Sequence, residues 1–382
     1  MKQLFLSLIT VFLLVCPLYA QEQLSKAEQT EAEIFAQDYL SSKDSSLSFG
    51  TNTHFTIEHI DQHIVVLGCR RPLCGIILIR SAYVGRANQR VLGYSTESTI
   101  GHNSNSMKGL LGYYETIVAK SIVNGIATFV DDFESLPKGK GKPATTLLQQ
   151  ITIGPLLKDY ELKQFDYSEV VDGITYTRRA GCGIIQLIQL MLYYNYPTSI
   201  QQYRCELGHA SKLKSIIPKD SLIHLDRFMC ERINAIINHL DGRKDTIMHH
   251  TVDIDEITPL AHFIATATDS EFHTGWTSTN SQGTLHALTE HLGFSRKMEI
   301  SHNSTVGEMY NRILCDLTNA HPVLVSGGGH GFICDGINAN GYLHFNLGWG
   351  GQNNGWYRFP VSDEKLRSGF LRSYITGVVP RK

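Results

Sequence analysis

Before residue 130, apolar and polar positions follow two different periods. In residues 22–42, apolar residues recur at helical intervals among Glu, Gln and Lys, which predicts an amphipathic helix. Residues 53–97 instead hold short β-branched and aliphatic runs separated by turns containing Gly, Pro and Arg, and this pattern is typical of strands. A second helix is expected over residues 107–123. The N-terminal third of the chain is therefore predicted to be an α+β unit.

The pattern changes after residues 134–143, Glu-Ser-Leu-Pro-Lys-Gly-Lys-Gly-Lys-Pro, which have no periodicity and read as an exposed linker open to proteolysis. Residues 182–240 are predicted to be helical, with the first helix at 182–194 and the last at 222–240. Antiparallel strands are predicted at residues 323–326, 331–335, 342–346, 356–359 and 374–379. A helical half followed by a sheet half indicates a second α+β domain.

The first 20 residues have the pattern of a secretory signal peptide. Lys2 is followed by an apolar run that ends at Ala20, and the run is too short to span a bilayer. Cys16 raises a lipoprotein alternative, but Val15 is larger than lipoprotein processing normally accepts before the cysteine. Cleavage after Ala20 is the preferred interpretation. We expect a secreted, periplasmic or cell-surface protein without stable membrane association.

Charge and cysteine content narrow the possible functions. The net charge is −2, so we expect no nucleic-acid partner, and no Gly-rich phosphate loop occurs. The chain has 8 cysteines, and removal of Cys16 with the signal leaves an odd number, which predicts at least one free thiol. Cys69 and Cys74 are close enough in sequence for a local bridge, which spacing alone leaves open. The histidines lack compact zinc spacing, and no metal or cofactor is implied.

Cys182 and His330 are the candidates for nucleophilic chemistry. Cys182 follows Gly181 and opens a strongly apolar helix, whose N-terminal N–H groups stabilise a thiolate. His330 follows three glycines at the start of an apolar strand, and its ordinary pKa suits a general base. An isolated residue of either type is more often structural, but their order and separation are typical of papain-like cysteine enzymes.

Several motifs resemble the streptopain family of secreted cysteine peptidases. One similar segment, in the N-terminal part, matches a motif of the family's inhibitory propeptide. The others surround the two candidate residues. The matching segments are Arg90–Ser95, Gly181-Cys182 with Gln189, Tyr194–Pro197, Leu285–Phe294, His321–Gly327, His330–Gly336 and Asn346–Gly351.

This resemblance implies a papain-like catalytic domain of α+β class, with a helical half and an antiparallel sheet half, behind an α+β prodomain. It implies that Asn346 accepts the imidazole N–H, although a turn asparagine before Leu347 is the alternative. Gln164 would donate to the oxyanion beside the backbone N–H of Cys182, with an exposed loop glutamine as the alternative. The expected residues of the substrate cleft are Gly181, Gly328, Gly329 and Trp349.

The sequence therefore predicts a signal peptide at 1–20, an inhibitory prodomain at 21–140 and a cysteine endopeptidase domain at 141–382. Its partners would be protein or peptide substrates and its own prodomain. The alternative from another class is a non-catalytic exported binding or inhibitory protein on a degenerate scaffold, because Leu347 replaces a tryptophan of the family motif. Acyl transfer by Cys182 and His330 to an acceptor other than water is the third possibility.

Overall fold

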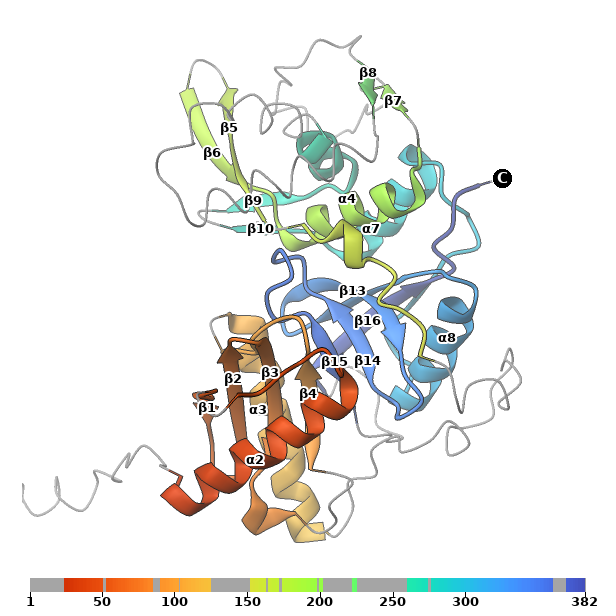
Figure 1. The fold of residues 1–382 in the computed structure, drawn as a ribbon. Helices are drawn as coiled ribbons and strands as arrows, with labels where there is room; N and C mark the ends of the chain where they lie inside the picture. The colour runs from red at the N-terminus through yellow and green to blue at the C-terminus, as the bar shows by residue number, and fades with distance from the viewer. Residues whose placement is uncertain are drawn as a thin grey trace, which may run out of the picture.

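The computed structural model describes residues 24–50, 53–84, 90–102, 104–124, 152–162, 164–171, 174–197, 199–201, 222–224, 260–273, 276–359 and 369–381. The described chain has the predicted α+β class, with helices against an antiparallel sheet (Figure 1). The predicted signal peptide and the linker at 134–143 lie outside the described residues.

The N-terminal unit is built from the elements that the sequence pattern predicts. Helix α2 (Lys26–Lys43) begins with a capping box in which Ser25 and Glu28 each bond the other's backbone N–H, so its start is fixed locally. The second predicted helix is α3 (Asn105–Asn124). A short 3-10 turn covers Ser81–Tyr83. The strands are β1 (Thr56–Ile60), β2 (Ile64–Arg70), β3 (Leu73–Ile79) and β4 (Val91–Ser95).

The C-terminal half supplies the remaining long elements. Its helices are α4 (Cys182–Tyr194), α7 (Ser281–His286), which continues as a π-helical turn over Ala287–His291, and α8 (Val306–Thr318). A 3-10 turn covers Lys158–Tyr160. The strands are β11 (Glu299–Ser301), β12 (Val323–Gly327), β13 (His330–Ile337), β14 (Leu343–Asn346), β15 (Gly355–Tyr357) and β16 (Leu371–Thr376). The five predicted strands of this half are confirmed.

One ten-stranded sheet joins the two halves, in the order β1-β2-β3-β4-β15-β14-β13-β12-β16-β11. The joint is the antiparallel pair β4 and β15, in which Tyr94 lies opposite Trp356 and Gly93 opposite Tyr357. The hydrophobic pattern predicts each strand but not its partner, because pairing between distant segments leaves no local signal. The N-terminal unit thus extends the sheet of the C-terminal half.

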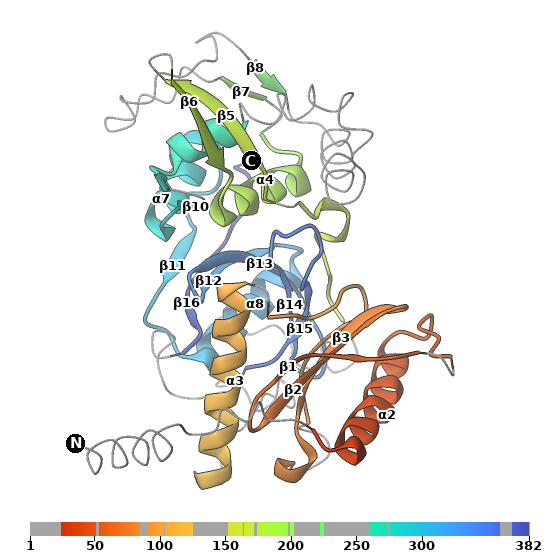
Figure 2. The ribbon, with the colours of Figure 1, turned by 90° about the vertical axis from the view of Figure 1, so that its left-hand side faces the viewer.

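Helices cover both faces of this sheet (Figure 2). On one face, α3 and α8 pack into a single apolar core that includes Tyr114 from the first half and Phe332 from the second. On the other face, α2 covers β2 and β3, while α4 packs against Ile333. Successive side chains of β13 point to opposite faces, so Phe332 and Ile333 belong to different cores. The core that α3 and α8 share makes the two halves one packing unit on that face.

Three two-stranded sheets complete the described structure. They pair β5 (Asp166–Val171) with β6 (Ile174–Arg179), β7 (Ser199–Gln201) with β8 (Leu222–His224), and β9 (Glu271–His273) with β10 (Trp276–Ser278). Of the helices predicted within 182–240, the first is confirmed as α4, which ends at Asn195 in the left-handed conformation, φ 46°, whereas residues 225–240 of the last one lie outside the described residues. Residues 199–201 and 222–224 form an antiparallel strand pair, in which the backbone groups of each segment pair with those of the other.

Chain segments near the predicted domain boundary are tied to the sheet. Ile153 exchanges two backbone hydrogen bonds with Ile337, and the N–H of Leu157 donates to the buried carboxylate of Asp335. The other carboxylate oxygen of Asp335 contacts Nδ1 of His344 at 2.6 Å. The C-terminal half is therefore anchored from Ile153 onward.

Cys69 and Cys74 lie opposite each other in the β2–β3 pair, and both are buried free thiols in this structure. Burial, together with the charge and the hydrogen bond of the neighbouring Cys69, raises the pKa of Cys74 to about 12. The local bridge that the spacing left open is thus not formed here. None of the described helices is long and apolar enough to cross a membrane.

Candidate active site

Cys182 stands at the first position of α4. Gly181 caps the helix in an extended conformation, and its carbonyl accepts from the N–H groups of Ile184 and Ile185. A Cβ at Gly181 would lie 2.7 Å from the carbonyl oxygen of Thr277 on β10, which explains the glycine. The buried body of α4 fixes the helix, which lies against β13 of the sheet half (Figure 1).

His330 is delivered by the turn between β12 and β13. Gly328 and Gly329 have φ of 56° and 74°, a left-handed region that favours glycine, and Gly327 pairs with His330 across the turn. The next backbone N–H, that of Gly331, donates to Sγ of Cys182 at 3.3 Å. The fold therefore brings together the cysteine and the histidine that the sequence analysis singled out.

The electrostatics of the pair favour the thiolate. Burial alone would raise the pKa of Cys182, but the hydrogen bond and the charge of His330, together with the N–H groups of Gly331 and Gly183, outweigh it. The net effect lowers the pKa of Cys182 from its ordinary value. Among the described cysteines, Cys315 is the second thiol that is partly accessible, and burial raises its pKa. The surroundings thus lower the pKa of Cys182 and raise that of Cys315.

The far side of the imidazole contacts the protein backbone. Nε2 of His330 lies 2.7 Å from the carbonyl oxygen of Leu347, so Nε2 carries a proton and Nδ1 is the nitrogen available to the thiol. The sequence predicted that the amide oxygen of Asn346 accepts this hydrogen bond. Its Oδ1 instead accepts from Nε2 of Gln189 at 3.1 Å and from the N–H of Gly348 at 3.0 Å. The turn after β14 therefore directs the Leu347 carbonyl, and not the Asn346 amide, toward the histidine.

Trp349 lies against the histidine and not in the cleft. Its ring stacks on His330 with 4.6 Å between the ring centroids and 30° between the ring planes. Of the four expected cleft residues, only Gly329 lines the cavity beside Cys182. Gly181 packs against Thr277, and a Cβ at Gly328 would meet the ring of Phe370. These two glycines shape the backbone around the site without lining the cavity.

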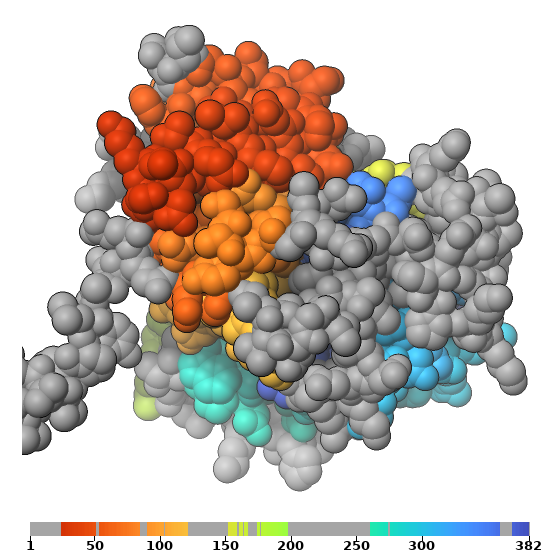
Figure 3. Space-filling model, turned by 90° about the horizontal axis from the view of Figure 1, so that it is seen from below, coloured from red at the N-terminus to blue at the C-terminus, as the bar shows by residue number. Residues whose placement is uncertain are grey.

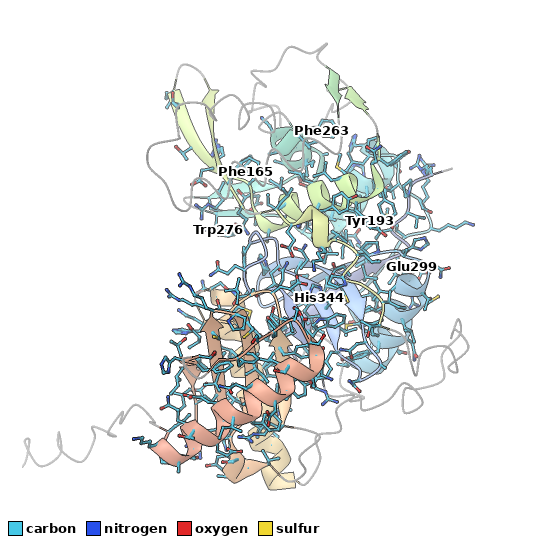
Figure 4. All side chains as sticks on the ribbon, viewed as in Figure 1. Phe165, Tyr193, Phe263, Trp276, Glu299 and His344 are labelled. Carbon is cyan, nitrogen blue, oxygen red and sulfur yellow. The ribbon has the colours of Figure 1, made fainter. Side chains whose placement is uncertain are left out.

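The cavity beside Cys182 has a volume of about 220 Å³. Its walls come from α4, from the hairpin β9–β10 with the start of α7, and from strands β12, β13 and β16. Gln186 and Trp276 are among the lining residues that were not predicted from the sequence. Gln186 lies one turn after Cys182 on α4. Trp276, 55% exposed, lies on β10 at the lower side of the helical half (Figure 4). The i+4 spacing from Cys182 could have identified Gln186, whereas nothing in the sequence places Trp276 near Cys182.

Gln164 is half-buried and does not line the cavity. Its neighbours anchor it near the site, because the carbonyl of Leu162 accepts from Gly350 and that of Phe165 accepts from Ala180. The hairpin β5–β6 returns the chain, pairing Asp166 with Arg179. The hairpin therefore brings this upstream glutamine close to Cys182 in space, and its oxyanion role stays a prediction.

The N-terminal unit does not cover the cavity with any described residue, since every lining residue lies at or after Cys182. It contacts the site from the side, where Gly109 of α3 packs near Gly328 and Phe370. Figure 3 shows the described part of this unit, red to orange, as one continuous mass on one side of the molecule. In the part of the chain that the structure describes, no group of three or more His, Cys, Asp or Glu side chains is arranged to hold a metal ion.

Known proteins are similar to this chain in sequence and in fold. Streptopain of Streptococcus pyogenes serotype M28 is 24% identical over 185 residues, which cover 47% of this chain and 45% of that protein. The thiol protease/hemagglutinin PrtT of Porphyromonas gingivalis is 36% identical over 75 residues, 18% of this chain and 9% of that protein. The chain thus spans less than half the length of these curated relatives.

The fold resembles that of a prointerpain A fragment from Prevotella intermedia, with a TM-score of 0.59 and 16% identity. The match covers 86% of this chain and 100% of that one. This likeness extends over both halves of the chain and shows that they have the fold of that fragment. The profile of the Peptidase C10 family matches residues 162–357, which contain Cys182, His330 and Asn346. The chain belongs to the Peptidase C10 family.

Proposed function

We propose that the chain is an exported cysteine endopeptidase made as a zymogen, with Cys182 as nucleophile and His330 as general acid and base. The observation that carries this proposal is the site geometry. The pKa of the Cys182 thiol is lowered by His330, whose Nε2 is held by the Leu347 carbonyl. A thiolate is the reactive form of cysteine, so the arrangement suits nucleophilic attack on a peptide.

In this mechanism Nδ1 of His330 takes the thiol proton, and the thiolate attacks the carbonyl carbon of the substrate. Negative charge then develops on the carbonyl oxygen, beside the backbone N–H of Cys182 at the helix N-terminus, where Gln164 donates a second hydrogen bond. The C–N bond breaks as Nδ1 returns the proton to the leaving amine. Water, deprotonated by His330, attacks the thioester and releases the acid.

Asn346 acts in this scheme as a positioning residue. Its Oδ1 holds the N–H of Gly348 and the amide of Gln189, which fixes the turn that presents the Leu347 carbonyl. The ring of Trp349 stacks on one face of the His330 imidazole and holds it in place. The imidazole is thus oriented by backbone and packing, so Leu347 in place of a tryptophan leaves its orientation intact.

We assign residues 1–20 to a signal peptide, 21–140 to an inhibitory prodomain and 141–382 to the peptidase domain, which acts on protein or peptide substrates. Because the N-terminal unit lies beside the cavity, latency would operate through the turn before His330, which α3 contacts near Gly328. This differs from a plug over the cleft.

The non-catalytic binding protein is the competing function, and thiol reactivity separates the two. A peptidyl epoxide should label the processed protein once, at Cys182, and Cys182→Ala should abolish both labelling and casein hydrolysis. Cys315→Ala is the matched control, since this partly accessible thiol has a raised pKa and should contribute to neither. Casein hydrolysis that survives Cys182→Ala would refute the proposed nucleophile. Stoichiometric labelling without hydrolysis of any protein would favour acyl transfer or binding.

A further inference from the structure

Gln186 is the polar residue of α4 nearest to Cys182 on the same helix face, one turn away. Its side chain is almost fully buried, with 6% exposed. The Nε2 atom lies 2.5 Å from the carbonyl oxygen of Phe332 and 3.4 Å from that of Val325. Both partners are acceptors, so the NH₂ group must face them. The amide oxygen therefore points to the opposite side.

That oxygen, Oε1, lies beside Gly331, which lines the cavity. A Cβ built on Gly331 would stand 3.1 Å from it, and Gly183 lies on the same side, so two glycines leave the space in front of it open. Gln186 itself lines the cavity beside Cys182. Among the described residues, none donates a hydrogen bond to Oε1. The cavity thus contains a fixed acceptor whose partner must come from solvent or from a bound molecule.

The rest of the lining determines which donor can approach. Leu324, Val325 and Ile375 form aliphatic walls, and the hydroxyls of Ser281 and Ser373 are bonded to each other at 3.0 Å. The lining contains no carboxylate among the described residues. A lysine or arginine side chain would therefore be desolvated without a counter-charge, which is costly.

We propose that Gln186 makes this cavity selective for a neutral, hydrogen-bond-donating side chain of the substrate, of the asparagine, glutamine or threonine kind. The inference rests on the proposed function and adds the class of substrate that the site accepts. An aliphatic side chain of the same size fits the walls but displaces solvent from Oε1 without donating a hydrogen bond to it. A site with a buried acceptor discriminates against such isosteres by about tenfold or more in kcat/KM.

The test uses pairs of nearly isosteric peptides, asparagine against leucine and threonine against valine, varied at each position within three residues of the scissile bond. The processed parent should favour the polar member by at least tenfold in kcat/KM at one position. Gln186→Met keeps the length of the side chain but removes the acceptor, so it should abolish or reverse that ratio. Gln186→Leu should do the same. Leu187→Met, a change on the same helix outside the cavity, should keep it.

The ratio of two substrates does not depend on the fraction of folded enzyme, so a partly unfolded variant still gives a result. A parent that favours the aliphatic member at every position would overturn the selectivity, as would an unchanged ratio in both Gln186 variants. If Cys182 is labelled and leucine peptides are cleaved in either case, the peptidase function stands and only the role of Gln186 fails. Absence of cleavage of every peptide would overturn both.

Discussion

The imidazole Nε2 of His330 lies 2.7 Å from the backbone carbonyl oxygen of Leu347. The group that orients the imidazole of His330 is therefore part of the main chain, and no side-chain substitution at position 347 removes it. The conformation of the turn that presents this carbonyl depends on Asn346, whose Oδ1 accepts the N–H of Gly348. Side-chain and backbone contributions to the site can thus be separated by mutation.

Leu347→Ala should retain nearly the full kcat per folded molecule, because the carbonyl stays in place. It should lower the free energy of unfolding by about 2–5 kcal/mol, since Leu347 is 4% exposed in the shared core. Urea unfolding and active-site titration measure the two effects. A loss of kcat as large as that of His330→Ala would show that the leucine side chain takes part in orientation.

His330→Ala should lower kcat by roughly 10²–10⁴-fold, because it removes the general acid and base. Asn346→Ala should cost less, about tenfold, since it removes two hydrogen bonds of about 1 kcal/mol each from the turn but transfers no proton. Single-turnover hydrolysis of a chromogenic ester or amide measures both variants. Equal losses would contradict the positioning role of Asn346.

Thiol alkylation should depend on pH with a midpoint below the ordinary thiol value. Burial raises the pKa of Cys182, but the hydrogen bond and the charge of His330 more than offset it, so the net pKa is lowered. The thiolate fraction should therefore rise with pH through this lowered value. In His330→Ala the opposing burial remains and the stabilising partner is lost, so the midpoint should move to higher pH. Iodoacetamide labelling of Cys182, followed by mass spectrometry, gives the profile. An unshifted midpoint would exclude the His330 contact as its cause.

Trp276 should contribute to substrate binding more than to chemistry. It is 55% exposed at the edge of the cavity and stacks on His273 with 3.9 Å between ring centroids. Trp276→Ala should raise KM by about fivefold, since an aromatic contact contributes about 1 kcal/mol, and leave kcat unchanged. Ile174→Ala, equally exposed on β6 but outside the cavity, is the control. A fall in kcat without a change in KM would contradict this role.

Cleavage of the linker should activate the enzyme in a concentration-dependent manner. A lysine-specific protease should cut near Lys138, Lys140 or Lys142, and the bound N-terminal unit becomes a separate ligand. Diluting the nicked sample should then increase specific activity, whereas the uncut chain should stay inactive at every concentration. Mass and activity are followed together. An uncut chain already as active as the product would show that the N-terminal unit is not inhibitory.

The interface should set how readily that unit is released. Tyr94 accepts a hydrogen bond from Nδ2 of Asn338, and its ring contacts those of Tyr342 and Trp356. Tyr94→Ala should therefore shift activation of the nicked sample to higher protein concentration, because less dilution is needed for release. Phe49→Ala, which removes an aromatic of the same unit that stacks on Phe55 of that unit, is the control. Identical dilution curves for the two variants would show that Tyr94 does not hold the interface.

Local patterns predicted the elements well, and long-range relations much less. The apolar helix after Cys182 and the strand after His330 were evident, because periodicity and glycine placement are local properties. The contact of His330 with the Leu347 carbonyl, and not with Asn346, was not predicted. It depends on the conformation of one turn, and every residue has a backbone carbonyl, so no residue type signals it. The cavity wall from β10 depends on tertiary packing, so Trp276 gave no signal in the sequence.

The pairing of β4 with β15 has a consequence for the order of folding. Tyr94 and Trp356 are neighbours in the sheet but are separated by more than half of the chain, 356 − 94 = 262 residues. The entropy of closing so large a loop must be lost before their contacts form, which makes such pairings slow. The ten-stranded sheet can be completed only when almost the whole polypeptide is present. During synthesis the strands β1 to β4 are available before β15, so the edge of β4 that faces β15 stays unpaired until the C-terminal segment has been made.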